Sequence, residues 1–184
     1  MVIFPKIQLA CVKDELRPIM EVVHINKQHV VATDSHILVV HDSASLLTDD
    51  FINNIPDGGC NIHRDDFAKF AGKECELSWK SKGIIRVTYS KRKRPILIEC
   101  EEDNKYIDYM HVIPDEKIEL TAQTSITINS KLLHTLQTAM TVNGDACEIK
   151  CYGTTHAMMV APVNGTDTNN VKGLIMPMFN KNNV

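Results

Sequence analysis

Alternation of apolar and polar residues with a period of two is the feature that most constrains the fold of this chain. It recurs in short blocks that are separated by Gly, Asn, Asp and Lys residues. Such blocks are typical of antiparallel strands that keep one face in water and bury the other. The sequence therefore predicts an α+β protein that is built mainly from antiparallel sheets.

The predicted strands form three groups along the chain, each with its own turns. The first group turns at Asn26–Gln28, and the second turns at Lys82–Gly83 and again between residues 91 and 95. These positions carry the residue types that favour turns. The runs, in chain order, are 19–25 and 30–40, then 76–80, 84–89 and 96–100, and finally 147–152, 157–161 and 174–179.

Two segments carry the apolar spacing of a helix. In the first, Asn61 or His63 can cap a short helix that Gly72 ends in a left-handed conformation. In the second, Asn129 or Ser130 caps a longer helix. We expect the apolar stripe of each helix to pack into the core. The inward residues are Ile62, Phe67, Phe70 and Ala71 in the first helix, and Leu132, Leu133, Leu136, Ala139 and Met140 in the second.

A helix followed by three strands occurs twice in this order, at about residues 60–115 and again at about residues 125–184. Residues 1–58 resemble a third copy, in which the helix shrinks to little more than a turn before Pro18. The length of this unit is near the upper end, about 50 residues, of ordinary repeat periods. The sequence therefore predicts repeated helix-plus-strands units.

Composition narrows the function classes. The chain has 184 residues, with 20 Lys and Arg against 23 Asp and Glu, so any affinity for nucleic acid depends on a local patch of charge. Its six cysteines show no C-x-x-C spacing and no secretory signal precedes them, which predicts reduced thiols in a cytoplasmic protein. No apolar run approaches the roughly 20 residues of a membrane span.

Three short stretches, far apart in the chain, resemble the bacterial DNA sliding clamp, the beta subunit of DNA polymerase III. Residues 31–38 read Val-Ala-Thr-Asp-Ser-His-Ile-Leu, similar to the clamp's Val-Ala-Thr-Asp-Gly-His-Arg-Leu. Residues 106–114 read Tyr-Ile-Asp-Tyr-Met-His-Val-Ile-Pro, similar to Phe-Pro-Asp-Tyr-Arg-Arg-Val-Leu-Pro. Residues 174–179 read Leu-Ile-Met-Pro-Met-Phe, similar to Val-Val-Met-Pro-Met-Arg. The order of the three stretches is also that of the clamp.

This resemblance implies a shortened and divergent clamp with two parts. Residues 1–115 resemble the middle clamp domain, and residues 116–184 resemble half of a clamp domain that ends in the Met-Pro-Met strand. In the family, the three stretches line a pocket that binds short hydrophobic motifs of replication proteins. The resemblance carries nine pocket residues over to this chain: Thr33, His36, Leu38, His111, Val112, Leu174, Met176, Pro177 and Met178. Flexible methionines suit such a site, because they adapt to different apolar side chains.

The chain also departs from the family pattern. Ile37 and His111 stand where the family has arginine, and Ile107 stands where it has proline. Phe179 replaces the terminal arginine, and a polar tail follows it. We therefore expect partner specificity to differ from that of the family.

Sliding clamps encircle duplex DNA and contact phosphates through Lys and Arg. The cations that could do so here are Arg64, Lys69, Lys73 and Lys131 on the helices, and Lys91, Arg92, Lys93 and Arg94 in a strand connection. Acidic residues are interspersed among the first set, so the predicted surface is only mildly basic. The connection could contact phosphate or keep a sheet edge soluble. Because one chain has only three repeats, a ring requires self-association into a homo-oligomer.

The sequence supports neither a zinc site nor a hydrolytic site. Cys147 and Cys151 lie about 13 Å apart on one strand at about 3.3 Å per residue, too far to ligate one zinc ion directly. Asp34 and His36 could face the same way, but no nucleophile motif or second carboxylate accompanies them, so Asp34 is expected to support a turn or to fix His36. We predict no catalytic residue, no metal and no cofactor.

The sequence therefore predicts a non-enzymatic, sliding-clamp-like processivity factor. Its expected partners are the peptide motif of a replicative or repair polymerase and, as a homo-oligomer, duplex DNA. The alternative is an adaptor that keeps the clamp scaffold and its peptide pocket but does not hold DNA, since a fold alone does not fix function.

Overall fold

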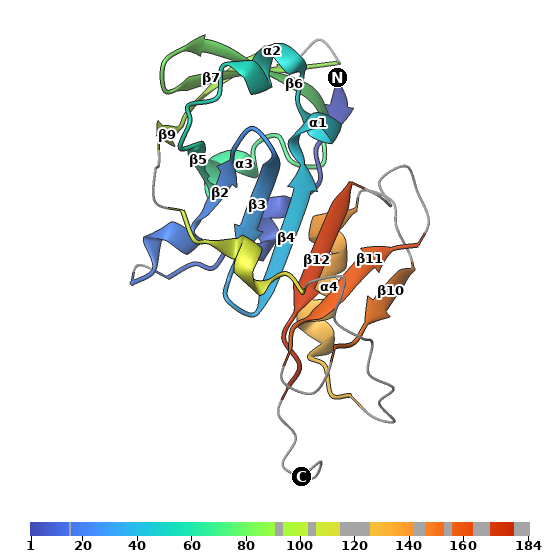
Figure 1. Cartoon of the computed structure of the whole chain (residues 1–184). Helices are drawn as coiled ribbons and strands as arrows, with labels where there is room; N and C mark the ends of the chain where they lie inside the picture. Colours follow the sequence, from blue (N-terminus) through green and yellow to red (C-terminus); the bar gives the residue numbers. More distant parts are fainter. Residues whose placement is uncertain are drawn as a thin grey trace.

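A computed structural model describes residues 1–14, 16–90, 94–102, 106–114, 126–141, 146–152, 156–163 and 170–178. These residues form two antiparallel sheets, one of four strands and one of eight (Figure 1). The predicted α+β class, with antiparallel sheets and repeated units, is confirmed. We call residues 1–58 the first unit, residues 60–102 the second unit and residues 126–178 the third unit.

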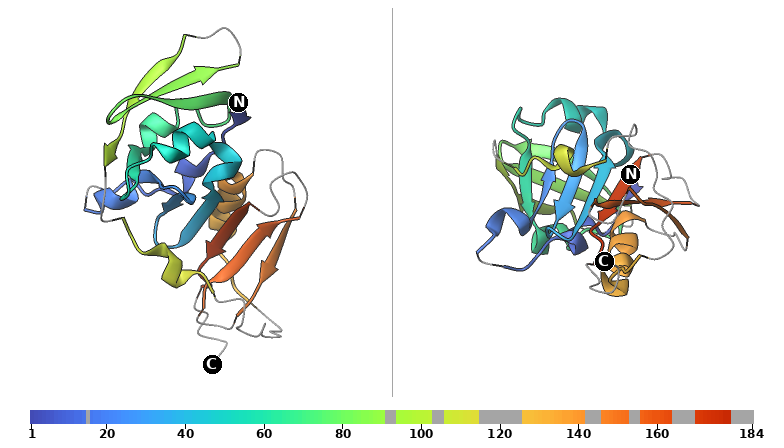
Figure 2. Two further views of the ribbon diagram at one scale, coloured as in Figure 1. Left: turned by 45° about the horizontal axis from the view of Figure 1, so that its top comes forward. Right: turned by 60° about the horizontal axis from the view of Figure 1, so that its bottom comes forward.

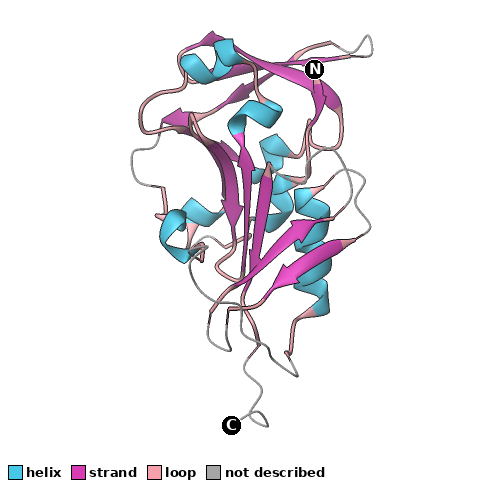
Figure 3. Ribbon diagram, turned by 45° about the vertical axis from the view of Figure 1, so that its right-hand side comes forward, coloured by secondary structure: helices cyan, strands magenta, loops and turns pink. Residues whose placement is uncertain are grey.

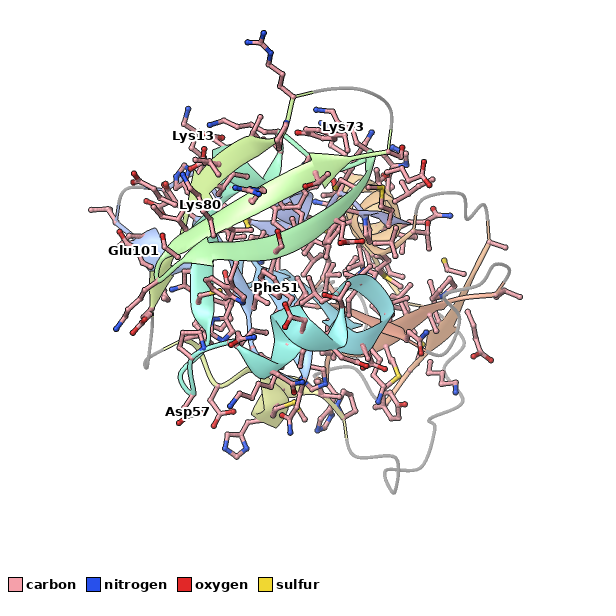
Figure 4. All side chains as sticks on the ribbon, turned by 90° about the horizontal axis from the view of Figure 1, so that it is seen from above. Lys13, Phe51, Asp57, Lys73, Lys80 and Glu101 are labelled. Carbon is pink, nitrogen blue, oxygen red and sulfur yellow. The ribbon has the colours of Figure 1, made fainter. Side chains whose placement is uncertain are left out.

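The four-stranded sheet has the strand order β1-β6-β7-β8. Its strands are β1 (Val2–Ile3), β6 (Glu74–Ser81), β7 (Ile84–Tyr89) and β8 (Ile96–Glu99). The last three form the meander predicted for the second unit, whereas β1 comes from the first unit. Seen from above, Lys73, Lys80 and Glu101 lie at separate places around this sheet and do not gather at one spot (Figure 4).

The eight-stranded sheet combines all three units in the order β10-β11-β12-β4-β3-β2-β5-β9. Three predicted strand runs were wrong in their bounds. Residues 30–40 form two strands, because the chain turns at residues 34–36. The run at 19–25 begins only at Val22, because residues 18–20 form a 3-10 turn, and the last strand covers residues 171–175 instead of 174–179. The strands are β2 (Val22–Ile25), β3 (His29–Thr33), β4 (Ile37–Asp42), β5 (Cys60–His63), β9 (Glu101–Glu102), β10 (Cys147–Lys150), β11 (Met158–Pro162) and β12 (Val171–Ile175).

Helix α4 (Ser130–Met140) is the second predicted helix, and its cap is the predicted Asn129. The Asn129 Oδ1 accepts hydrogen bonds from the backbone N–H groups of Lys131 and Leu132, at 3.0 and 3.4 Å. Such a side chain satisfies donors that have no partner within the first turn. Leu136, Ala139 and Met140 are buried, so the predicted stripe faces the core.

The first predicted helix is shorter than expected. Helix α3 covers only Arg64–Phe67, and His63 caps it by accepting the N–H of Asp65. Ile62 was expected on the inner face of this helix, but it lies in strand β5 and is buried there. Gly72 has a φ of 73°, in agreement with the predicted left-handed end.

Two short helices were not predicted, α1 (Ser43–Leu46) and α2 (Asp49–Asn53). Helix α2 could have been predicted from the sequence, because Thr48 is a capping residue and two aspartates occupy the first turn. The predicted shrunken helix of the first unit is represented by single 3-10 turns, η1 (Ile7–Ala10) and η2 (Pro18–Met20). A third turn, η3 (Tyr109–Val112), follows the second unit.

Apolar side chains cover both faces of the eight-stranded sheet. On one face, η1, α3 and α4 enclose the main core, and η1 contacts both α3 and α4 (Figure 3). On the other face, η3 packs across β3, β4 and β12 through a smaller cluster of five buried residues (Figure 1). These five are Val31, Leu38, Val40, Tyr109 and Leu174.

Strands on both sides of the predicted domain boundary therefore share one sheet. Strand β12 of the third unit pairs with β4 of the first unit, from Val171 opposite His41 to Ile175 opposite Ile37. The boundary at residue 115 lies outside the described residues, and the division into residues 1–115 and 116–184 stays a prediction. Among the described residues, no helix has the length and apolar character that crossing a membrane requires.

Candidate peptide-binding pocket

An apolar pocket lies beneath η3, on the face of the sheet that is opposite to α4. Its volume is about 230 Å³. Its floor is the β4–β12 junction, where Leu38 lies directly opposite Leu174. Tyr109 and Val112 of η3 form one wall. The complete lining is Met20, Thr33, Ser35, His36, Ile37, Leu38, Ile107, Tyr109, Val112, Ala157, Leu174 and Met176.

Six of the nine predicted pocket residues line this cavity: Thr33, His36, Leu38, Val112, Leu174 and Met176. Three do not. His111 is an exposed side chain that forms an ion pair with Asp108, with Nε2 and Oδ2 separated by 3.0 Å. Pro177 and Met178 lie just beyond the lining, and the N–H of Met178 donates to the carbonyl of Thr127. The structure thus assembles most of the predicted set from segments that are far apart in the sequence.

A tight turn at residues 34–36 shapes one end of the pocket. The Asp34 carboxylate accepts the backbone N–H groups of His36 and Ile37, both at 2.8 Å. The Thr33 hydroxyl donates to the Ile37 carbonyl at 2.7 Å and accepts the N–H of Ser35 at 3.1 Å. Asp34 therefore supports the turn, one of the two roles expected for it, and its bonded oxygen is engaged with backbone and not with an imidazole.

Ser35 is the one described non-glycine residue with a positive φ, 77°. A side chain in this region costs roughly 1–2 kcal/mol per residue, which explains why glycine suits the equivalent position of the similar clamp motif. The Arg17 guanidinium donates to the Ser35 hydroxyl at 3.2 Å and also pairs with Asp14 at 2.8 Å. Arg17 thus brings a positive charge to the rim of the pocket.

Polar contacts behind the wall hold η3 in place. The buried Tyr109 hydroxyl lies 3.2 Å from Asn26 Nδ2 and 2.9 Å from His29 Nδ1. Burial raises the pKa of Tyr109 and lowers that of His29, so both groups are neutral near pH 7. Next to them, the rings of His24 and Tyr106 stack with their centroids 4.3 Å apart.

Sequence reasoning missed half of the lining. Ile37 and Ile107 depart from the family pattern and were not among the predicted pocket residues, yet both line the pocket. Tyr109 could have been predicted from its chemistry. The ring of a tyrosine can form part of an apolar wall while its hydroxyl forms a buried hydrogen bond. Met20, from the distant η2, and Ala157, which precedes β11, had no local signal in the sequence.

The chemistry of the site is that of binding. Its lining is mostly apolar, and the Thr33 and Asp34 side chains of the turn bond to backbone. Burial raises the pKa of the Cys11 thiol to about 12 and that of Cys75 to about 11, so these buried cysteines stay protonated. Among the residues that the structure describes, no three His, Cys, Asp or Glu side chains come together as a metal site needs.

The predicted DNA contacts are scattered and partly neutralised. Arg64 donates to the Cys11 carbonyl and lies 3.7 Å from Asp65, while Lys69 forms an ion pair with Asp66. Lys73 donates to the Lys69 carbonyl and lies above the Tyr89 ring. Lys131 and Arg94 are exposed. Lys91, Arg92 and Lys93 lie outside the described residues.

Solved structures with the same architecture identify the fold. The beta subunit of DNA polymerase III from Borrelia burgdorferi, in complex with a natural product, superposes with a TM-score of 0.65 and 14% identity, covering 95% of this chain and 60% of that one. The beta chain from Streptococcus pneumoniae gives a TM-score of 0.65 and 15% identity over 95% and 61% of the two chains. The chain has the fold of a bacterial DNA sliding clamp.

A third similar structure is the Helicobacter pylori beta clamp bound to a DNA ligase peptide, with a TM-score of 0.61, 13% identity and coverage of 95% and 61%. The chain thus spans about three fifths of the length of these clamps. No family model and no curated protein sequence matches it. The predicted resemblance to the sliding clamp is confirmed at the level of fold.

Proposed function

We propose that this clamp-fold chain is a processivity factor whose pocket binds a short hydrophobic motif of a replicative or repair polymerase. The observation that carries the proposal is the position of the pocket, because it lies at the junction between β4 of the first unit and β12 of the third unit. Six residues that were chosen from the clamp resemblance line it. The Helicobacter pylori clamp, which shares the fold, is bound to a DNA ligase peptide.

The size and lining of the pocket support a ligand of this class. A volume of about 230 Å³ accommodates one or two large apolar side chains but not a folded domain. Exposed apolar side chains continue the surface beyond the cavity, namely Met110 and Val112 on η3 and Met176 and Met178 after β12. Burying a Leu or Phe side chain stabilises a complex by about 1.5–3 kcal/mol, so two such contacts contribute about 3–6 kcal/mol to binding.

The test is a titration of a fluorescent clamp-binding peptide into the protein. Met176→Ala and Leu38→Ala are expected to weaken binding about tenfold each, equivalent to about 1.4 kcal/mol. Leu97→Ala is the control, since Leu97 is similarly exposed to Met176 but lies on β8 in the four-stranded sheet and does not line the cavity. A folded wild-type protein that does not bind, or equal losses in all three variants, would overturn the pocket assignment.

We further propose that an oligomer of the chain encircles duplex DNA in the cytoplasm. The supporting observation is the placement of three cations. Arg64 lies in α3, Lys69 in the turn that follows α3, and Lys131 in α4. These elements cover one face of the sheet. Duplex binding should then fall steeply with salt, because each neutralised phosphate releases counterions. Lys131→Glu is expected to weaken binding, whereas Lys80→Glu on the four-stranded sheet is expected to leave it unchanged.

A specific observation favours the alternative of an adaptor that does not hold DNA. Lys69 is paired with Asp66 and Arg64 lies beside Asp65, so little of this positive charge is free to meet phosphate. Peptide binding without salt-dependent duplex binding would identify the chain as a clamp-fold adaptor. The two functions share the pocket and differ only in this measurement.

A further inference from the structure

Two buried thiols meet where the chain passes from one sheet to the other. After β8 the chain leaves the four-stranded sheet, and it joins the edge of the eight-stranded sheet as β9, beside β5 (Figure 2). Cys100 lies at this crossing, between Glu99 at the end of β8 and Glu101 at the start of β9. Cys60 is the first residue of β5. The two cysteines are far apart in the sequence, so only the fold brings them together.

The pairing of β5 with β9 places both cysteines on the same face. Asn61 lies opposite Glu101, and each cysteine directly precedes one member of this pair. Because successive side chains alternate between the two faces of a strand, both thiols point to the face opposite to that of the pair. Both belong to the main core, with exposed fractions of 0% for Cys60 and 7% for Cys100. The two side chains are therefore diagonal neighbours in a buried layer.

The two thiols are in contact and differ in character. The Cys60 thiol donates a hydrogen bond to the Cys100 sulfur. This bond lowers the pKa of Cys100, although burial and the nearby Glu102 act in the opposite direction. The same bond and burial raise the pKa of Cys60. Cys100 therefore ionises more readily than an ordinary cysteine, whereas the buried Cys11 and Cys75 ionise less readily.

Cys100 also lines an open cavity, which gives a small molecule access to its sulfur. The cavity has a volume of about 510 Å³, and residues of both sheets line it. Cys100 is the one cysteine among the described residues of the lining, and the fully buried Cys60 is not part of it. The lining includes four carboxylates, those of Glu21, Asp66, Glu99 and Glu101. Such a surface disfavours anionic reagents and admits a small neutral oxidant such as hydrogen peroxide.

We propose that Cys100 and Cys60 form a peroxide-sensitive modification site, in which oxidation joins them by a disulfide. The Cys100 thiolate attacks one oxygen of hydrogen peroxide and the O–O bond breaks, so Cys100 becomes a sulfenic acid. The hydroxide that leaves takes up the proton that Cys100 lost on ionisation. The Cys60 sulfur then attacks the Cys100 sulfur, the S–O bond breaks, and water leaves with the Cys60 proton. Two thiols and one peroxide thus give a disulfide and two water molecules, with the sulfurs oxidised and the peroxide oxygens reduced.

The surroundings of the pair are compatible with an S–S bond. The length of this bond is about 2.05 Å, so the two sulfurs must approach each other from hydrogen-bond contact. Because Cys100 belongs to neither β8 nor β9, this movement leaves the pairing of β5 with β9 in place. The disulfide closes the chain from residue 60 to residue 100 into a loop, which restricts the unfolded chain and stabilises the folded one. A dithiol reductant restores both thiols.

The experiment exposes the folded protein to hydrogen peroxide in small excess and maps disulfides by mass spectrometry of an unreduced digest. Wild-type protein is expected to yield two peptides joined through Cys60 and Cys100, which dithiothreitol separates. Cys75→Ala changes a buried cysteine of β6 outside the pair, so this control should give the same joined peptides. The oxidised protein should also unfold at a higher denaturant concentration than the reduced protein.

Two variants test the order of the steps. Cys60→Ser retains a hydrogen-bond donor to Cys100 but cannot form the disulfide, so Cys100 is expected to stop at the sulfenic acid, which dimedone labels. In Cys100→Ala, the thiol of Cys60 is expected to persist, because Cys60 does not line the cavity. The wild-type measurement requires no variant, so it stays decisive if either variant does not fold.

Two outcomes would overturn the proposal. One is a folded wild-type protein in which Cys60 and Cys100 remain thiols after the half-buried Cys147 and Cys151 have been oxidised. The other is a disulfide that joins Cys60 or Cys100 to a different cysteine. Because no readout involves a peptide or DNA, the result of the peptide titration leaves this test unaffected.

Discussion

The Tyr109 hydroxyl lies 2.9 Å from Nδ1 of His29, and this contact joins the wall of the pocket to the sheet beneath it. Asn26 Nδ2 donates to the same oxygen, so the hydroxyl gives its own proton to the imidazole. The lowered pKa of His29, caused mainly by burial, agrees with a neutral ring that accepts this proton. One side of Tyr109 thus anchors η3 while its ring lines the cavity.

Tyr109→Phe should weaken peptide binding without removing any apolar surface from the pocket. It leaves Asn26 and His29 without this partner, which costs about 1 kcal/mol of unfolding free energy and allows η3 to move. Peptide affinity should fall roughly threefold to tenfold. Tyr89→Phe is the control, because the Tyr89 hydroxyl donates to the Lys69 carbonyl far from the pocket. Equal affinity in both variants would contradict an anchoring role for Tyr109.

Asp34→Ala should loosen the turn at residues 34–36. The change removes the acceptor of two backbone N–H groups, at a cost of about 1–3 kcal/mol in denaturant unfolding. It should also lower peptide affinity, since Ser35, His36 and Ile37 line the cavity. Asp34→Asn retains an acceptor and is expected to recover most of the stability. If the two variants were equally unstable, the loss would come from the charge and not from the turn.

The local parts of the fold could be predicted from the sequence, and the pairing of strands could not. Asn129 followed by an apolar stripe is enough to place α4, because capping and periodicity are properties of neighbouring residues. The pairing of β12 with β4 joins residues 130 or more positions apart, and no periodicity specifies it. Likewise, β1 of the first unit pairs with β6 of the second unit.

The pocket was partly predictable, and for a different reason. Leu38 and Leu174 were chosen because two short stretches resemble those of a clamp, and the structure places them opposite each other. His111 was chosen in the same way and points into solvent, because the 3-10 turn of η3 directs Tyr109 and Val112 toward the sheet. Met20 lines the pocket because of where η2 packs, which only the tertiary structure reveals.

Gly173→Ala should destabilise the contact between α4 and the sheet. A Cβ atom at Gly173 would lie 2.2 Å from Met140 Sδ and 3.1 Å from Leu136 Cδ1, and both side chains are fully buried. Overpacking of this kind costs about 1–3 kcal/mol, which thermal unfolding would detect. Met140→Ala combined with Gly173→Ala should recover part of the loss, since it removes the nearest obstructing atom. A single variant as stable as wild type would mean that α4 can move away from β12.

Stability should fall on acidification because of His41, a buried residue of β4. Burial lowers the pKa of its imidazole from 6.5 to about 4, although the nearby Ala139 carbonyl favours the charged ring. Between these two values the unfolded chain binds more protons than the folded chain, so the unfolding free energy decreases as the pH drops through this window. The loss should approach roughly 3 kcal/mol near pH 4. His41→Leu is expected to flatten the dependence in denaturant titrations across this range. An unchanged slope in His41→Leu would assign the acid sensitivity to other groups, of which His29 is the first to test.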